Sequence, residues 1–405
     1  MINLTEYIML LEEYSAIKGK QISLKKENKK AAIVSFGGTS LSSDNVRSVD
    51  LIYSREMLEN EYGRHVDFVS HIVKGDIDNE YCKDITETKL KDYDEVWVYM
   101  APENAFGGIL SADGIELFNQ ICDYNGTLYG IVADPKILPT NYGEFLNNRV
   151  KRGVLHTDKG NNRDVTDAKF KRFTKKWDNI IIAFGGINYD KFFNEYEEKK
   201  DKGTPSHNFK LPIANNTFKW CEFPVFTYYA KKEKYEEKIK DYPYNRKYDL
   251  VYFGNNRGGS RDNKLEKYYD VKGLNNYIIG FNYDGFKYCR HTSNGKYVNH
   301  DELFKLICEN AYATVVIGDE LHDNNFMTVR FFEAMLLDIV GFISDEYDTE
   351  HKLIKNKELA DFIYVKNSDE VKEKIEKIKK NKSLFDKIIK QERAEVNRIY
   401  NEYFK

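Results

Sequence analysis

Two arginines in a glycine-containing segment have the spacing to bind a diphosphate. In YFGNNRGGSRDNK (252–264) an apolar run ends at Gly254, and Arg257 and Arg261 then flank a Gly-Gly pair. Glycines let backbone N–H groups approach an anion, and two guanidinium groups four residues apart can hold a pyrophosphate. The segment therefore predicts a diphosphate site. The alternative is a basic surface loop whose glycines only turn the chain, since the segment matches neither the Walker loop nor G-x-G-x-x-G.

An arginine and a glutamate in a second segment could bind a phosphate and a sugar. In IGDELHDNNFMTVRFFEAM (317–335) an apolar run ends at Gly318, and we predict a helix that begins near Asn325. Arg330 and Glu333 then lie one turn apart on one helix face. At the carboxyl edge of a sheet the arginine can hold a phosphate and the glutamate a sugar diol. The alternative is an ordinary surface ion pair.

A carboxylate after a third apolar run could act as a general base. In GTLYGIVADPKILPTNYGEF (126–145) Asp134 follows the run, and Pro135 and Pro139 constrain the loop. A half-desolvated carboxylate at the carboxyl end of an α/β strand suits proton abstraction. The alternative is a turn former or a helix cap.

A basic segment is a candidate contact for a nucleic-acid backbone. Residues 149–176 hold ten Lys or Arg against three Asp, whereas the whole chain has 62 Lys or Arg against 65 Asp or Glu, a net charge of −3. A local positive charge of this size can meet phosphates, although a solvated charge run is the alternative. The candidate contacts are Lys151, Arg152, Arg163, Lys171 and Arg172.

Two glycine-rich turns could line the same binding cleft as the segments above. They are SFGGTSLSSD (35–44) and NAFGG (104–108), the latter containing Gly107 and Gly108. Either is also compatible with a simple tight turn between a strand and a helix. No pair of histidines has metal-ligand spacing, so we predict no protein metal site.

The elements that must position these residues are short buried strands that alternate with helices. A Lys- and Glu-rich connection (231–249) interrupts this alternation, which then restarts. After Asn367 the pattern becomes helical, with Asn367 and Glu370 placed for a capping-box-like start of a helix. This alternation indicates two doubly wound α/β halves. The apolar runs are AAIVSF (31–36), VDFVS (66–70), EVWVYM (95–100), TLYGIVA (127–133) and NIIIAF (179–184), then LVYFG (250–254), NYIIG (276–280), YATVVIG (312–318) and DIVGFIS (338–344).

Composition excludes several classes of protein. The 405 residues exceed a single small module, and 41% hydrophobic with 31% charged residues indicates a soluble globular protein. No apolar run approaches the ~20 residues of a membrane span, and glutamates in the first 13 residues argue against a signal peptide. The five cysteines are far apart, so we predict reduced core thiols in a cytoplasmic protein.

Taken in order, these segments resemble the DNA β-glucosyltransferase family of T-even bacteriophages, GT-B enzymes that glucosylate 5-hydroxymethylcytosine in duplex DNA. The densest similarity runs through DNNFMTVRFFEAM and DIVGFISDEYDTEHKLI to the terminal helix, residues 312–395. Weaker matches extend back through NGKYV (294–298), FGNNRGGSR (253–261), FGGIN (184–188), ADPKILP and NAFGG. The resemblance covers most of the chain after residue 30.

The resemblance implies a role for each matching residue of the donor site. Arg257, Arg261 and Arg330 match phosphate-binding arginines, and Glu333 falls where the family binds the ribose hydroxyls. Gly254 is a further position of the donor site. Gly280 and the backbone around Tyr297 fall where the family holds the ribose and uracil, and His322 replaces a tyrosine beside the nucleotide.

For the acceptor site, Asp134 matches the base that takes the proton of the acceptor hydroxyl. Lys136 replaces an arginine two residues after that base, and Gly107 and Gly108 belong to a matching turn. The basic segment 149–176 and residues 1–30 have no clear counterpart, so the identity of the acceptor is the least constrained part of this interpretation.

The implied fold class is α/β of the GT-B type, with two Rossmann-like lobes facing a central cleft and a C-terminal helix crossing back to the N-terminal lobe. The predicted domains are an N-terminal extension (1–30), an acceptor- and DNA-binding lobe (31–235), a UDP-sugar-binding lobe (236–380) and a C-terminal helix (381–405) that packs on the N-terminal lobe.

The implied activity is inverting transfer of a sugar from a UDP-sugar to the hydroxymethyl group of a modified pyrimidine in duplex phage DNA. The donor is UDP-glucose or another UDP-sugar. The modified nucleotide would be flipped out of the helix. A divalent cation (Mg or Mn) would assist. The expected protein is a monomer in the host cytoplasm that binds double-stranded DNA and no membrane. The alternatives are a GT-B glycosyltransferase with a non-DNA acceptor, or a catalytically silent nucleotide-sugar- or DNA-binding protein.

Overall fold

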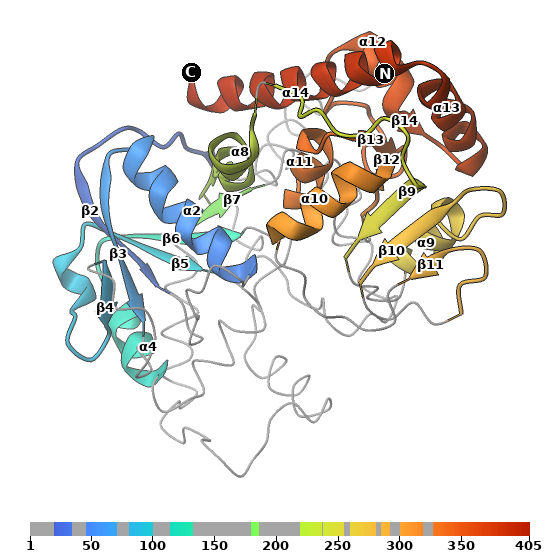
Figure 1. The fold of residues 1–405 in the computed structure, drawn as a ribbon. Coiled ribbons are helices and arrows are strands. Elements are labelled where there is room, and N and C mark those ends of the chain that lie inside the picture. Colours follow the sequence, from blue (N-terminus) through green and yellow to red (C-terminus); the bar gives the residue numbers. More distant parts are fainter. Residues whose placement is uncertain are drawn as a thin grey trace, which may run out of the picture. The chain divides into compact units, whose positions relative to one another are not determined.

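The chain divides into two compact units, Met1–Val225 and Phe226–Lys405 (Figure 1). Each is built around one parallel sheet, and each is described by itself. The computed structural model describes residues 20–34, 46–70, 81–99, 114–132, 180–185, 219–236, 238–254, 260–280, 285–291, 300–318 and 327–405.

The N-terminal unit contains an eight-stranded sheet with the order β1-β8-β7-β6-β5-β2-β3-β4, in which every pair is parallel. Strand order reverses between β2 and β5, the arrangement of a doubly wound sheet. Helix α2 packs on β3 (Figure 1). The strands are β1 (Lys20–Gln21), β2 (Lys29–Val34), β3 (Arg64–Ser70), β4 (Cys82–Asp84), β5 (Glu95–Tyr99), β6 (Thr127–Val132), β7 (Ile181–Phe184) and β8 (Lys219–Glu222).

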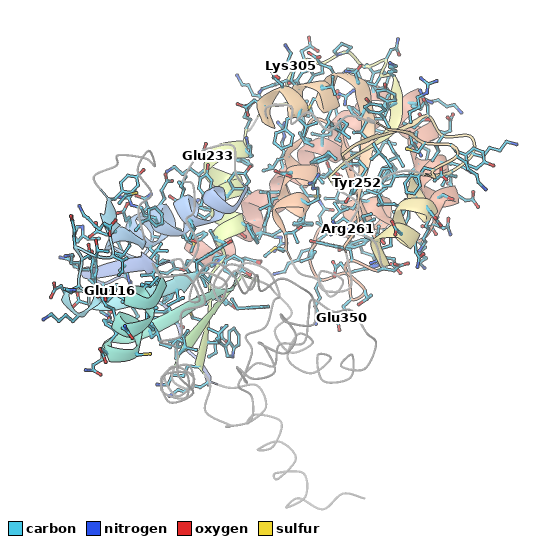
Figure 2. The ribbon with its side chains drawn as sticks, turned by 90° about the horizontal axis from the view of Figure 1, so that it is seen from below. Glu116, Glu233, Tyr252, Arg261, Lys305 and Glu350 are labelled. Carbon is cyan, nitrogen blue, oxygen red and sulfur yellow. The ribbon has the colours of Figure 1, made fainter. Side chains whose placement is uncertain are left out.

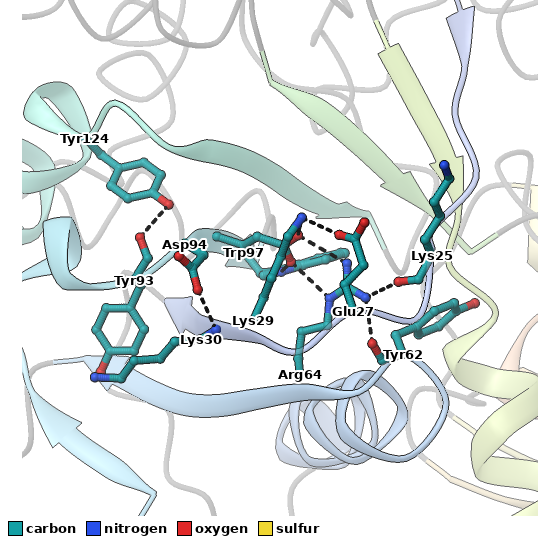
Figure 3. Close-up of polar contacts among 11 residues, drawn as sticks. Lys25, Glu27, Lys29, Lys30, Tyr62, Arg64, Tyr93, Asp94, Trp97 and Tyr124 are labelled. Carbon is teal, nitrogen blue, oxygen red and sulfur yellow. Dashed lines mark hydrogen bonds and ion pairs between the residues drawn. The ribbon is translucent and has the colours of Figure 1, made fainter.

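A buried ionic cluster ties the amino ends of three of these strands together (Figure 3). Glu95 is fully buried and accepts hydrogen bonds from Arg64 Nη2 and Lys29 Nζ, both at 3.1 Å. Trp97 donates to the same carboxylate at 3.3 Å and stacks on Tyr129 with ring centroids 3.9 Å apart. Loss of one partner would leave a buried charge uncompensated, so the cluster fixes the strand register on the edge opposite the predicted functional loops.

The C-terminal unit contains a six-stranded parallel sheet with the order β11-β10-β9-β12-β13-β14. Numbered within the unit, this order is 3-2-1-4-5-6, that of a dinucleotide-binding doubly wound fold. The strands are β9 (Tyr248–Phe253), β10 (Asn276–Ile279), β11 (Arg290–His291), β12 (Ala311–Val316), β13 (Val340–Ser344) and β14 (Tyr364–Val365).

Helix α14 packs against α11, α12, α13 and β13 within the C-terminal unit (Figure 1). Helix α11 approaches β13 so closely that a Cβ at Gly341 would lie 2.8 Å from the carbonyl oxygen of Ala334. Only glycine fits there, which fixes α11 on the sheet. The helices are α2 (Val46–Asn60), η1 (Leu90–Asp92), α4 (Gly114–Asp123), α8 (Val225–Tyr229), the π-helical η2 (Ala230–Lys234), α9 (Ser260–Tyr268), α10 (His300–Asn310), α11 (Val329–Leu336), α12 (Lys357–Ile363), α13 (Ser368–Lys380) and α14 (Lys382–Phe404).

Most sequence predictions about the elements are confirmed. Each predicted apolar run overlaps a strand, and Asn367 caps α13 by accepting from the N–H groups of Asp369 and Glu370. The cysteines are free, and four of the five are buried. Within the described ranges, no helix is both long and apolar enough to cross a bilayer.

One helix boundary is corrected. The helix predicted near Asn325 begins at Val329, because Thr328 is its N-cap and accepts from the N–H of Phe331. Asn325 itself lies outside the described residues, and Met327 and Thr328 are not helical.

Candidate functional site

The C-terminal sheet places its candidate site where strand order reverses, between β9 and β12. Gly254 directly follows β9, and Gly318 lies two residues beyond the end of β12. In open α/β sheets, ligands bind outside the carboxyl ends of the strands at this reversal. Gly280 follows β10, and its neighbour Ile279 is in register with Phe253 and accepts from the N–H of Gly254 at 2.9 Å. Three of these strands therefore end at the same edge.

Gly254 keeps the end of β9 clear. Its φ is +152°, and a Cβ at this position would lie 3.3 Å from Tyr252 Oη and 3.4 Å from Arg330 Nη2. A side chain would thus be strained and would press against the arginine.

Replacing Gly254 by alanine should destabilise the fold by about 1–3 kcal/mol and also displace Arg330. Gly273→Ala is the matched control, because Gly273 has φ +93° but nothing within 4 Å of its Cβ position. We expect both variants to lose stability in urea unfolding, and only Gly254→Ala to lose affinity for an anionic ligand of this site. Equal ligand affinity in the two variants would contradict this role.

Arg330 is held in place by three groups. Its guanidinium lies 3.8 Å from the centroid of the Phe253 ring, and Nη1 donates to the carbonyl oxygen of Phe253. Its Nε lies 3.8 Å from Glu333 Oε2, too far for a hydrogen bond. The side chain remains 33% exposed. An immobilised, partly exposed positive charge at the edge of the sheet is suited to an anion such as a diphosphate.

Glu333 is a buried carboxylate beside that positive charge. It is 4% exposed, and burial raises its pKa to about 6, against the opposing effects of Arg330 and Lys234. At pH 7 it is therefore mostly ionised, and it can accept hydrogen bonds from hydroxyl groups. The predicted pairing of Arg330 with Glu333 is observed, but as a half-buried pair at the reversal rather than an ordinary surface ion pair.

The stability of the protein should report the state of Glu333. Its folded-state pKa of about 6 lies above the ordinary value of 4.5 for a glutamate, so its contribution to the free energy of unfolding is full below pH 4.5 and is lost as the pH rises through 6. Glu333→Gln should therefore raise the free energy of unfolding by about 2 kcal/mol at pH 8 and leave it nearly unchanged at pH 4.5. Chemical denaturation at the two pH values measures this, and equal effects at both would contradict the shifted pKa.

Helix α9 adds a second positive group. Arg261, labelled in Figure 2, is its second residue and is partly buried. The N-terminus of a helix carries partial positive charge, which favours a bound anion.

Sequence reasoning missed Lys264, on the same helix. Lys264 is 5% exposed and its Nζ donates to the carbonyl oxygen of Gly318 at 3.1 Å, which joins α9 to the chain leaving β12. In the sequence, only the spacing of three residues between Arg261 and Lys264 indicated that the two side chains lie on the same face of a helix.

Comparisons with curated proteins and with solved structures find relatives of this chain. No protein-family model matches the sequence. The DNA beta-glucosyltransferase of Enterobacteria phage T4 is 24% identical over 359 residues, which cover 86% of this chain and 89% of the relative. The predicted resemblance is confirmed.

Solved structures of the T4 enzyme have the same fold. T4 phage BGT in complex with UDP and Mn²⁺ matches this chain with a TM-score of 0.64 and 21% sequence identity. T4 phage BGT in complex with its UDP-glucose substrate matches with a TM-score of 0.63 and 20% sequence identity. Both matches cover 92% of this chain and 96% of the T4 chain. The predicted GT-B fold class is therefore confirmed, whereas the predicted domain boundaries stay predictions.

The structure brings together three of the predicted donor-site residues, Gly254, Arg330 and Glu333, and sets Gly280 beside Gly254 in the sheet register. Arg261 lies in the first turn of α9. The other predicted positions lie outside the described residues: Arg257, Tyr297, His322, Asp134, Lys136, Gly107, Gly108, Lys151, Arg152, Arg163, Lys171 and Arg172.

Proposed function

We propose that this protein is a UDP-glucose-dependent glycosyltransferase that modifies DNA. The observation that carries the proposal is the arrangement of Arg330 and Glu333 beside Gly254 at the strand reversal, in a chain similar over 86% of its length to a DNA beta-glucosyltransferase. A neighbouring cation and carboxylate match the two polar parts of a nucleoside diphosphate, its phosphates and its ribose.

In the donor site, Arg330 binds the diphosphate together with Arg257 and Arg261. These positive charges stabilise the charge that develops on UDP as it leaves, where fixed electrostatics contribute most. Glu333 accepts hydrogen bonds from the ribose hydroxyls. Gly280, the backbone around Tyr297 and His322 complete the nucleotide contacts.

In the acceptor site, Asp134 is the proposed base. It lies two residues after Val132, the last residue of β6, and outside the described residues. Asp134 takes the proton of a hydroxymethyl group while the oxygen of that group attacks the anomeric carbon of the sugar from the face opposite UDP. The reaction therefore inverts the configuration at the anomeric carbon. The substrate is a hydroxymethylated pyrimidine flipped out of duplex DNA, with unstacking offset by phosphate contacts from Lys136 and the basic segment 149–176.

A divalent cation assists the reaction. Among the described residues, no group of three or more His, Cys, Asp or Glu could hold a metal ion. Mg²⁺ or Mn²⁺ would neutralise charge on the departing diphosphate. We further propose a monomer that acts in the host cytoplasm.

The test is a transfer assay with radiolabelled UDP-glucose and three duplexes that differ at one base, cytosine, 5-hydroxymethylcytosine or 5-hydroxymethyluracil. We expect label on the 5-hydroxymethylcytosine duplex alone. Hydrolysis of UDP-glucose without labelled DNA would favour a different acceptor. A protein that neither binds nor hydrolyses UDP-glucose would contradict the proposed function.

A further inference from the structure

The two central strands of the C-terminal sheet stop pairing with each other before their carboxyl ends. Among the described residues, pairing between β9 and β12 ends at Ala313 and Leu250. Each strand stays paired with its outer neighbour to its end, β9 with β10 up to Phe253 and β12 with β13 up to Val316. The fork between β9 and β12 therefore opens directly below Gly254.

Side chains take the backbone hydrogen bonds on both sides of this fork. On β12, the N–H of Val315 donates to Tyr269 Oη at 2.7 Å, and Tyr269 O–H donates to the carbonyl oxygen of Val315 at 3.0 Å. On β9, the carbonyl oxygen of Phe253 accepts from Arg330. Buried backbone groups must be bonded, and in a continuous sheet the neighbouring strand would bond them.

Tyr269 is rigidly held and is connected to the donor site. It is fully buried and directly follows α9. Its ring meets the ring of Tyr252 edge to face, with centroids 5.3 Å apart. Tyr252 Oη in turn lies 3.3 Å from the Cβ position of Gly254. The rings of Tyr269 and Tyr252 thus connect Val315 on β12 with the carboxyl-terminal part of β9.

We propose that Tyr269 is a positioning residue that holds β9 and β12 apart and so keeps the donor site open. The proposal rests on the proposed function only for the identity of the ligand. Without the hydroxyl, the two strands can pair further, and the site is then open in a fraction of molecules. The apparent donor affinity is then the intrinsic affinity multiplied by that fraction, while turnover at saturating donor is retained.

Tyr269→Phe tests this, and the neighbouring tyrosine is a matched control. Tyr268 is also fully buried, and its hydroxyl contacts Ser344 Oγ at 3.2 Å and the carbonyl oxygen of Val365 at 3.1 Å, at β13 and β14. We expect Tyr269→Phe to raise the KM and Kd for UDP-glucose about tenfold, with kcat within about twofold and KM for DNA unchanged. Tyr268→Phe should lose stability but keep its donor KM.

Two outcomes would overturn the proposal: unchanged donor affinity in folded Tyr269→Phe, or an equal rise in donor KM in Tyr268→Phe. If Tyr269→Phe does not fold, Thr314→Val replaces it, because Thr314 Oγ1 lies 3.3 Å from the Tyr269 hydroxyl. We expect Thr314→Val to raise the donor KM about threefold. An unchanged donor KM in this variant would overturn the proposal.

A crystal structure of Tyr269→Phe gives a readout that does not depend on the ligand. We expect Val315 to pair with β9 in that variant, and an unchanged fork would overturn the proposal. If the wild-type protein binds no UDP-glucose while the fork closes in the variant, the proposed function fails and the role of Tyr269 stands.

Discussion

Asp134→Asn should abolish sugar transfer while the protein continues to bind UDP. Asparagine has nearly the shape of aspartate but cannot accept the proton of the attacking hydroxyl. Without the base we expect kcat to fall about a thousandfold or more, in the upper range for general base catalysis. The proposed donor site belongs to the other unit, so the Kd for UDP should change by less than about twofold.

Asp92→Asn is a suitable control, because Asp92 is an exposed carboxylate in η1 of the same unit. Steady-state kinetics with labelled UDP-glucose and titration calorimetry with UDP give the two readouts. Near-normal turnover in Asp134→Asn would remove Asp134 from its proposed role.

Arg330→Met should lower kcat/KM for UDP-glucose about a hundredfold, since it removes a fixed positive charge beside the leaving diphosphate. Methionine keeps much of the apolar contact with Phe253, so most of the loss should come from the charge. Lysine in place of Arg330 should restore little, because a single ammonium cannot donate to Phe253 and to a phosphate in the same forked geometry.

Arg55→Met is the matched control. Arg55 lies 3.9 Å from the centroid of Tyr81, donates to the carbonyl oxygen of Val66 and pairs with Glu59 at 2.8 Å, but it belongs to the N-terminal unit on α2. It thus reproduces the packing of Arg330 away from the proposed donor site. A similar loss of kcat/KM in both variants would mean that Arg330 acts through stability alone.

The long buried strands could be predicted from the sequence and the short edge strands could not. Every residue of β9 and β12 is buried, and apart from Asp249 and Thr314 both strands are apolar. In contrast, β1 and β11 are two-residue strands, Lys20–Gln21 and Arg290–His291, that exist only because a neighbouring strand offers backbone partners. Polar pairs of this kind have no periodicity to detect.

The arrangement of the proposed donor-site residues could be predicted where these residues lie close in sequence. Arg330 and Glu333 are three residues apart on one helix, so their proximity follows from helical geometry. The contacts of Lys264 with Gly318 and of Tyr269 with Val315 join residues 54 and 46 positions apart, and only the sheet order brings them together. The burial that raises the pKa of Glu333 likewise depends on packing that no local pattern encodes.

The most direct test of the account is a crystal structure of the protein with UDP bound. We expect the diphosphate within hydrogen-bonding distance of the Arg330 guanidinium, and the ribose hydroxyls on the Glu333 carboxylate, above the carboxyl ends of β9 and β12. UDP bound at another edge of either sheet, with Arg330 and Glu333 contacting only each other, would contradict it.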